Sequence, residues 1–305
     1  MNKKILLYYK YVHIANPQEI RDWQLKLCQQ LGLEGRIILA HEGINGTVAG
    51  LETSTDAYIA AMNEHPLFGE IDFKQTIVPL EHTYFDRLRI VVKSEIVNLG
   101  INPDELKADN GATHLTPTQA HELLKNKPEN LVVLDGRNYY EARVGKFEGA
   151  ITPEIEHFRD FPNYIEQNLE QFKDKQVLMY CTGGIRCERA SAYLKEKGVA
   201  QEVYQILGGI HRYVEQFPEG FFRGKNYVFD SRVTVKVNDD IVGSCDHCGV
   251  ASDEYSNCCN AFCNKQFLCC KECLELFSNA CSAICAELRK ENKVPQRPLK
   301  ARVQV

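Results

Sequence analysis

A cysteine followed by two glycines and an arginine is the stretch of this 305-residue sequence best suited to chemistry. Cys181 ends an apolar run, residues 177–180, that predicts a buried strand, and good helix formers follow from Ala190. Between these two elements, Gly183 and Gly184 allow a sharp turn that points several backbone N–H groups inward. Such a turn at the positive end of a helix favours thiolate over thiol, so we predict that Cys181 is an activated nucleophile. The alternative is an ordinary strand-to-helix turn with an inert, buried cysteine.

The segments around this loop predict a sheet that holds it in place. Short apolar runs at residues 131–134, 177–180 and 202–207 are typical of buried strands, and helical patterns alternate with them, beginning at Thr116. This alternation predicts an α/β domain with a parallel sheet and helices on both faces, which we assign to residues 113–225. Cys181 then lies at the carboxyl end of a central strand, where open α/β sheets place their sites.

The loop from Cys181 to Arg186 resembles the active-site loop of the rhodanese superfamily. Supporting stretches occur in the corresponding order: Asp135-Gly136-Arg137, Glu141 with Gly149-Ala150-Ile151, and Leu207-Gly208-Gly209-Ile210. The resemblance implies that Cys181 carries a persulfide or another covalent sulfur state, and that Arg186 attracts the anion and holds the loop shape. The same resemblance assigns the active-site loop to Thr182, Gly183, Gly184, Ile185 and Cys187.

Cys187 has a part in two further interpretations. A cysteine loop for phosphate-ester cleavage has its arginine one residue later, where this chain has Cys187, so the phosphatase interpretation is weak. Cys187 itself is either a resolving thiol or a small buried residue at the start of the helix.

Ten of the thirteen cysteines lie between residues 245 and 285, which points to metal ligation in a chain without an export signal. Short C-x(2–4)-C pairs bring two thiolates close enough for tetrahedral zinc. We predict a zinc-binding segment, residues 226–305, in which structural zinc is held by Cys245, Cys248, Cys259, Cys263, Cys270, Cys273, Cys281 and Cys285. The spacing leaves open which pairs share a site and whether His247 replaces a thiolate. An iron–sulfur cluster or a set of free thiols is the alternative.

The first 112 residues predict a ferredoxin-like α+β sandwich, in the order β-α-β-β-α-β. Strands are expected at 5–12, 36–40 and 88–92, with a hairpin turn through Asn45-Gly46, and helices begin near Asn16-Pro17 and Ser54. His41, beside Glu42, suggests a phosphate or RNA-base contact, or alternatively a surface residue in a turn. Residues 100–111 have the composition of a linker.

Charge and hydropathy indicate which partners the protein can bind and where in the cell it acts. The net charge of −5 argues against a protein that coats nucleic acid, but it leaves room for a local basic face. A basic tail supplies the best electrostatic candidate for RNA contact, and a plain solvated tail is the alternative; its cations are Arg289, Lys290, Lys293, Arg297, Lys300 and Arg302. The sequence shows no signal peptide and no apolar run long enough for a membrane span, so we expect a cytoplasmic protein.

Taken together, these parts resemble one family along nearly the whole chain, the bacterial rhodanese-domain tRNA uridine hydroxylases. The resemblance implies oxygen-dependent 5-hydroxylation of the wobble uridine of tRNA, uridine-34, with Cys181 as the catalytic cysteine, tRNA as partner and molecular oxygen as co-substrate. The sequence has no glycine fingerprint for a flavin or nicotinamide cofactor. A plain sulfurtransferase and a non-catalytic RNA-binding protein are the rival functions.

Overall fold

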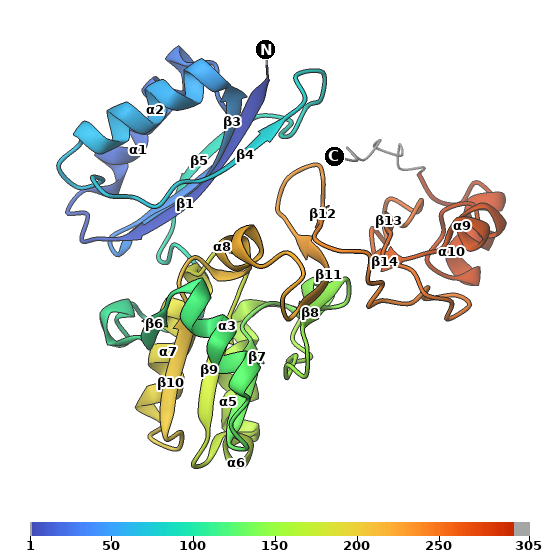
Figure 1. Ribbon diagram of the computed structural model, residues 1–305. Helices are drawn as coiled ribbons and strands as arrows, with labels where there is room; N and C mark the ends of the chain where they lie inside the picture. The colour runs from blue at the N-terminus through green and yellow to red at the C-terminus, as the bar shows by residue number, and fades with distance from the viewer. Residues whose placement is uncertain (1, 296–305) are drawn as a thin grey trace. The chain divides into compact units, whose positions relative to one another are not determined.

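The computed structural model describes residues 2–295, which divide into two compact units (Figure 1). The first unit comprises residues 2–139 together with 149–220, and the second comprises 140–148 together with 221–295. No helix within the described residues is both long and apolar enough to cross a membrane.

The first unit begins with a five-stranded sheet that carries two helices. Its elements are β1 (Lys3–Tyr11), α1 (Pro17–Gln30), β2 (Glu34–Ala40), β3 (Gly43–Leu51), α2 (Glu52–Glu64), β4 (Lys74–Val78) and β5 (Leu88–Val92). The strand order is β4-β1-β3-β2-β5, antiparallel except for the parallel pair β2–β5. The expected ferredoxin-like sandwich is therefore confirmed. Its last strand is β4, however, and the stretch 88–92 forms an additional edge strand.

The predicted hairpin turn at Asn45-Gly46 is wrong. Ala40 pairs with Gly43, so His41 and Glu42 form the turn, and Asn45 and Gly46 lie inside β3. Gly46 serves a packing purpose there, because a Cβ atom at this position would lie 2.3 Å from the ring of Tyr8 on the neighbouring strand.

The two faces of β1 have different partners because side chains alternate along a strand. Leu6 and Tyr8 point into the core beneath α1 and α2, which cover one face of the sheet in Figure 1. Leu7, Tyr9 and Tyr11 occupy the opposite face. This second face is where the rest of the first unit meets the sheet.

The central domain is built on a four-stranded parallel sheet, as expected. Its elements are the 3₁₀ turn at Ala108–Asn110, β6 (Thr113–Leu115), α3 (Pro117–Asn126), β7 (Leu131–Asp135), the 3₁₀ turn at Phe158–Asp160, α5 (Phe161–Gln167), α6 (Leu169–Phe172), β9 (Gln176–Tyr180), α7 (Ile185–Glu196), β10 (Glu202–Ile206) and α8 (Gly209–Gln216). The strand order is β6-β10-β9-β7, and all three pairs are parallel. Helices α5 and α7 pack together, as do α3 and α8, so β9 lies inside the domain.

The second unit contains short elements and the cysteine-rich segment. They are β8 (Gly145–Phe147), β11 (Phe222–Tyr227), β12 (Thr234–Lys236), β13 (Tyr255–Asn257), β14 (Gln266–Leu268), α9 (Lys271–Leu276) and α10 (Ala283–Lys290), with α4 (Tyr139–Ala142) at the point where the chain enters the unit. Strands β12, β11 and β8 form one sheet, and β13 pairs with β14. Around the hairpin, the core consists largely of cysteines with Phe267. This segment therefore has little apolar packing of its own to stabilise it.

Candidate functional site

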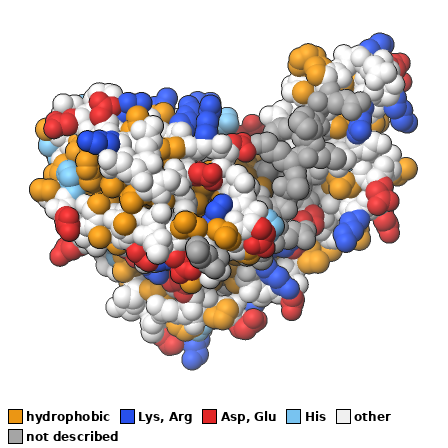
Figure 2. Space-filling model, turned by 90° about the horizontal axis from the view of Figure 1, so that it is seen from above, with side chains coloured by type: hydrophobic (Ala, Val, Ile, Leu, Met, Phe, Trp, Pro, Cys, Tyr) orange, Lys and Arg blue, Asp and Glu red, His pale blue; other side chains and the backbone are white. Residues whose placement is uncertain are grey.

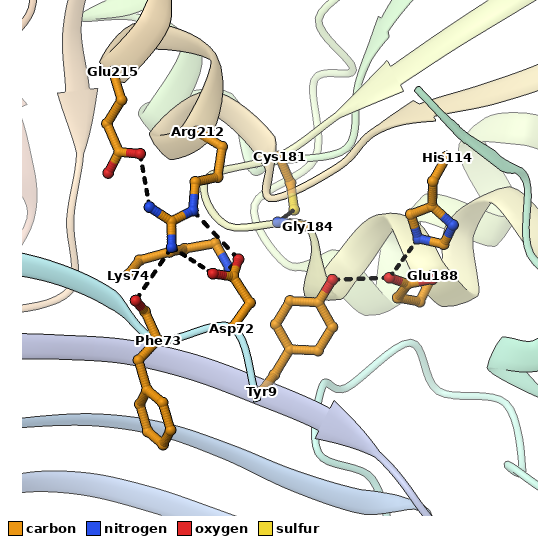
Figure 3. Close-up of polar contacts among 10 residues, drawn as sticks. All are labelled: Tyr9, Asp72, Phe73, Lys74, His114, Cys181, Gly184, Glu188, Arg212 and Glu215. Atoms are coloured by element: carbon orange, nitrogen blue, oxygen red, sulfur yellow. Dashed lines mark hydrogen bonds and ion pairs between the residues drawn. The ribbon is translucent and has the colours of Figure 1, made fainter. Parts of the chain in front are cut away.

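Cys181 is the first residue after β9, and α7 begins only four residues later (Figure 3). Gly184 closes the turn with a φ of +104°, a conformation that side chains with a Cβ rarely adopt. Its N–H donates to the Cys181 sulfur at 3.2 Å. The loop therefore wraps its backbone around the thiol.

The surroundings of Cys181 favour its charged form. Burial raises the pKa of this thiol, but a hydrogen bond from the Cys187 side chain, the Arg186 charge and the N–H groups of Cys187 and Arg186 outweigh it and lower the pKa to about 6. The pKa of Cys187 moves the other way, well above its ordinary value, because it is buried beside Cys181. At neutral pH, Cys181 is thus a thiolate and Cys187 a thiol that donates to it.

Backbone hydrogen bonds from α8 fix the position of the cysteine loop. The N–H groups of Ile210 and His211 donate to the carbonyl oxygens of Cys181 at 2.9 Å and Thr182 at 3.1 Å. Gly209 makes this approach possible, since a Cβ there would lie 2.3 Å from the Cys181 carbonyl oxygen. Arg186, which is buried, donates to the Thr182 hydroxyl at 3.3 Å and ties the two ends of the loop together.

A buried ion pair supports the strand ends beneath the loop. Asp135 accepts from Arg137 at 2.7 Å and from the Tyr180 hydroxyl at 2.7 Å, and all three side chains are inaccessible to solvent. The N–H of Gly136 donates to the Tyr180 carbonyl at 2.8 Å. The end of β9 is therefore fixed to the end of β7 immediately before Cys181.

The N-terminal sheet covers the cysteine loop. A Cβ built on Gly184 would lie 2.7 Å from the Tyr9 hydroxyl, and one built on Gly183 would lie 3.1 Å from the Leu7 side chain. The methylenes of Lys74 lie against the same loop, 3.9 Å from that position on Gly183. Cys181 itself has no exposed surface. Its thiol therefore lies beneath side chains that another domain contributes.

A charged cluster joins the two domains beside this cover (Figure 3). Arg212, in the first turn of α8, pairs with Asp72 and donates to the Phe73 carbonyl at 3.2 Å. Asp72 also pairs with Lys74 at 2.9 Å, and Arg212 pairs with Glu215 at 2.7 Å. Burial lowers the pKa of the Lys74 ammonium, while Asp72 favours its charged form.

A second cluster is centred on Glu188 in α7. One of its oxygens accepts from the Tyr9 hydroxyl at 2.8 Å and from His114 at 3.0 Å, and the other accepts from Gln205 at 2.8 Å. Burial raises the pKa of this carboxyl, but these three donors lower it below its usual range. The hydrogen bond to Glu188 raises the pKa of His114.

An open cavity of about 380 Å³ lies between the two clusters. Its wall includes Tyr9, Lys74, His114, Glu188 and Gly208. Cys181 is not part of this wall, although Tyr9 and Lys74 contact the cysteine loop from their other side. The cavity is therefore next to the thiol, and side chains separate the two.

The cysteine-rich segment forms two groups of four sulfur atoms, each within 4.8 Å of one another. One group is Cys245, Cys248, Cys270 and Cys273, and the other is Cys258, Cys263, Cys281 and Cys285. Seven of the eight predicted ligands belong to these groups. Cys259 is the exception: the group contains its neighbour Cys258 instead, and the Cys259 N–H donates to the Asn279 carbonyl at 2.8 Å. Neighbouring side chains of an extended chain point in opposite directions, so one member of the doublet faces away.

The sulfur spacing in both groups fits a tetrahedral ion. Sulfur atoms are 3.8 Å apart between Cys248 and Cys270 and 3.6 Å apart between Cys263 and Cys281. Four ligands about 2.3 Å from one zinc ion are separated by about 3.8 Å. His247 points elsewhere: its Nε2 contacts the Ala280 carbonyl at 3.0 Å, and its ring stacks on Phe277.

Of the residues predicted to contact RNA, three have partners within the chain, one is exposed, and three lie outside the described residues. His41 is exposed in its turn and contacts the Ile14 carbonyl at 2.9 Å, and it does not line the cavity. Arg289 donates to the Ser278 carbonyl, and Lys293 pairs with Glu291 at 2.8 Å. Lys290 is exposed. Arg297, Lys300 and Arg302 lie outside the described residues.

Glu42, next to His41, has a structural role. It accepts the Ile96 N–H at 2.7 Å and lies 3.5 Å from Arg189 in α7. Arg189 is completely buried, pairs with Glu95 at 2.7 Å and donates to the Ile101 carbonyl at 2.6 Å. These contacts fix the hairpin and the following linker to the helix that begins at the cysteine loop.

The sequence prediction missed Tyr9, Lys74, His114 and Glu188. One signal was available: Leu7, Tyr9 and Tyr11 alternate with the core residues of β1 on a face that a two-layer sandwich leaves to solvent. Three large side chains there indicate that a second layer covers that face.

The parallel sheet and the thiolate loop after its central strand define a rhodanese-like domain, and the rhodanese-like domain family model matches residues 116–216. Two further models flank it: an acylphosphatase-like domain, UPF0176, over residues 3–96 and a rhodanase C-terminal model over residues 223–286.

Similar proteins extend this likeness to the whole chain. A protein from Cytophaga hutchinsonii named tRNA uridine(34) hydroxylase is 44% identical over 92% of this chain and 89% of its own length. One of the same name from Corynebacterium jeikeium is 42% identical over 88% of this chain and 89% of its own. Rhodanese-like domain-containing protein 6 of Arabidopsis thaliana is 43% identical over 88% of this chain, which spans half of that protein. The chain belongs to the tRNA uridine(34) hydroxylase family.

Proposed function

We propose that this protein is an enzyme that hydroxylates C5 of the wobble uridine of tRNA. The observation that carries the proposal is the similarity of nearly the whole chain to proteins named for that activity. A thiolate suited to attack on an electrophilic carbon supports it. We infer a cytoplasmic location from the tRNA substrate.

Cys181 is the proposed catalytic residue. Addition of its thiolate to C6 of uracil forms a carbon–sulfur bond and moves the electron pair of the C5–C6 double bond towards C5, the carbon that gains the hydroxyl group. The positive charge of Arg186 and the loop N–H groups favour the thiolate before attack and after release. Molecular oxygen is the proposed source of the hydroxyl oxygen. Its second atom leaves as water, with two electrons and two protons from a thiol reductant, and loss of the C5 hydrogen as a proton with release of the Cys181 thiolate restores the C5–C6 double bond. Reaction under ¹⁸O₂ should increase the mass of the product nucleoside by two units.

Reconstitution with the purified chain tests the proposal. Incubation in air with a thiol reductant and tRNA that lacks the modification, followed by mass spectrometry of its nucleosides, should detect 5-hydroxyuridine with the wild type and none with Cys181→Ser. Cys28→Ala is the matched control, because Cys28 is a buried thiol of the N-terminal core whose pKa burial raises to about 12. Full activity of Cys181→Ser would eliminate the thiol mechanism and leave the enzyme assignment standing. Inactivity of the wild type in this assay, together with unchanged 5-hydroxyuridine-derived nucleosides in cells lacking the protein, would eliminate the function.

Sulfur transfer is the second candidate, because the rhodanese-like domain and its loop are common to both functions. A thiosulfate–cyanide assay run beside the tRNA assay separates them. Cyanide-dependent release of thiocyanate at a rate far above that of tRNA hydroxylation would favour the transferase.

We also propose that each four-cysteine group holds one structural zinc ion. Thiolates spaced for a closed tetrahedron leave no open position for substrate, so the metal supplies stability to the second unit. Iron–sulfur clusters remain the alternative, and metal analysis of the purified protein distinguishes them.

A further inference from the structure

The cavity beside the cysteine loop has the size and the polar groups of a site for one heterocyclic base. Its volume of about 380 Å³ is near the lower end of small-molecule sites, which are roughly 300–1,000 Å³. It opens to solvent, and its wall includes the tyrosines Tyr9 and Tyr11. A ring can enter such a site while the sugar and phosphate to which it is attached stay outside.

The charges of the wall favour a neutral ring over an anion. Four carboxylates contribute to it against two lysines and a histidine: Glu70, Asp72, Asp109 and Glu188, with Lys10, Lys74 and His114. Asp72 already pairs with Lys74 and with Arg212, so the lysine charge is largely balanced. A phosphate or a thiosulfate dianion would face the remaining carboxylates. A base with hydrogen-bonding edges avoids that repulsion.

Glu188 retains capacity for one more donor. A carboxylate offers about four lone-pair positions. Tyr9, His114 and Gln205 occupy three of these on Glu188, two at one oxygen and one at the other. The position left is an acceptor, and it suits an N–H group.

His114 supplies the complementary donor. Its Nε2 lies 3.0 Å from Glu188 and 2.7 Å from the Gln205 amide nitrogen. Whether Nε2 donates to Glu188 in the protonated ring or accepts from Gln205 in the neutral ring, Nδ1 carries a hydrogen. The side chain is 43% exposed at the cavity wall. An acceptor beside a donor matches the N3–H and a neighbouring carbonyl oxygen of uracil, whereas cytosine presents an acceptor at N3.

We propose that this cavity binds the uracil base of the target nucleotide, with Glu188 accepting from N3–H and His114 donating to a ring carbonyl, an inference that rests on the function proposed above. A wobble nucleotide lies in a single-stranded loop, so turning its base outward costs little. Tyr9 and Lys74 then stand between the bound ring and Cys181, and they must shift for C6 to reach the sulfur. The N-terminal domain thereby contributes to base selection.

Binding of anticodon stem-loop RNAs that differ only in having uridine or cytidine at the wobble position tests this proposal. All measurements use the full chain in a Cys181→Ser background, so no turnover occurs. The parent should bind the uridine RNA at least about fivefold more tightly, as expected for one good edge contact. Glu188→Gln should reduce that preference to less than twofold, because an amide can also donate to N3 of cytosine.

Two further variants complete the experiment. His114→Leu, at a half-exposed position, should also reduce the preference for uridine, and it serves if Glu188→Gln fails to fold. Glu196→Gln is the matched control, an exposed carboxylate at the other end of α7, and should keep the parent's preference. Retention of the full preference by folded Glu188→Gln and His114→Leu would refute the base site.

The experiments distinguish a failure of the proposed function from a failure of the base site. If the wild type hydroxylates tRNA but neither variant changes the preference, the base site is wrong and the function stands. If no hydroxylation occurs and the preference still depends on Glu188, the function is wrong and the base site stands.

Discussion

Replacement of Arg189 by methionine should destabilise the first unit, because this guanidinium neutralises two carboxylates in a place without solvent. Arg189 is fully buried, Glu95 is 2.7 Å away and Glu42 is 3.5 Å away, with exposed side-chain fractions of only 8% and 9%. Methionine fills much of the volume but leaves both charges uncompensated. Breaking a buried ion pair in this way costs about 3–5 kcal/mol, so we expect a loss of this size in the free energy of unfolding.

The pH dependence of this loss follows from Glu42. Burial already raises the pKa of the Glu42 carboxyl above its ordinary value, and both the Ile96 N–H and Arg189 lower it. Without Arg189 that pKa rises further. A carboxyl whose pKa is higher in the folded than in the unfolded protein destabilises the fold when it is ionised. This destabilisation is lost as the pH falls through the pKa of the carboxyl in the folded protein towards its pKa in the unfolded protein. The deficit of Arg189→Met should therefore be larger at pH 8 than at pH 5.

Urea denaturation at both pH values measures the deficit. Arg36→Met is the control, an exposed arginine whose loss should change stability by no more than about 0.5 kcal/mol. Adding Glu42→Gln and Glu95→Gln to Arg189→Met removes the buried charges and should recover most of the loss, because an amide oxygen can still accept the N–H groups of Ile96 and Leu99. A deficit below about 1 kcal/mol, or one that is independent of pH and unrelieved by the amides, would refute the reasoning.

Three further predictions concern the thiols and the loop. The rate of Cys181 alkylation, followed by mass spectrometry of the Cys181 peptide, should rise with pH through a midpoint near 6. Arg186→Met should move this midpoint to higher pH. An unchanged midpoint would show that Arg186 does not stabilise the thiolate. In elemental analysis, Cys258→Ser should lower the zinc content from about two ions per chain to about one. Cys259→Ser should keep both ions. Equal losses in the two variants would place Cys259 among the ligands. Gly184→Ala should abolish hydroxylation in the tRNA assay. The φ of +104° at Gly184 is strained for a residue with a Cβ, and the Tyr9 hydroxyl occupies the place of the added methyl group. Wild-type activity of this variant would show that the loop adapts.

Local patterns were sufficient to predict the cysteine loop. The strand before Cys181, the glycines after it and the start of the helix occupy adjacent positions in the sequence, so the backbone conformation follows from them directly. The parallel sheet followed from alternating strands and helices for the same reason.

Local sequence patterns could not predict contacts between segments that are distant along the chain. Lys74 and Glu188 are 114 positions apart, and their common cavity exists only because the second face of the N-terminal sheet covers the loop. A similar limit explains Cys259. Spacing along the chain identifies a cysteine doublet, but the direction of the backbone after β13 decides which sulfur joins the four-cysteine group.

The order of the cysteines along the chain prevents the two four-cysteine groups from forming as separate domains. The groups interleave: Cys258 and Cys263 of the second lie in the loop between Cys248 and Cys270 that the first group closes. The second group is complete only at Cys285. The loop that the first group closes therefore carries half of the second group, and the second group ties that loop to the segment beyond Cys273. Opening either group would release the backbone on which the other depends.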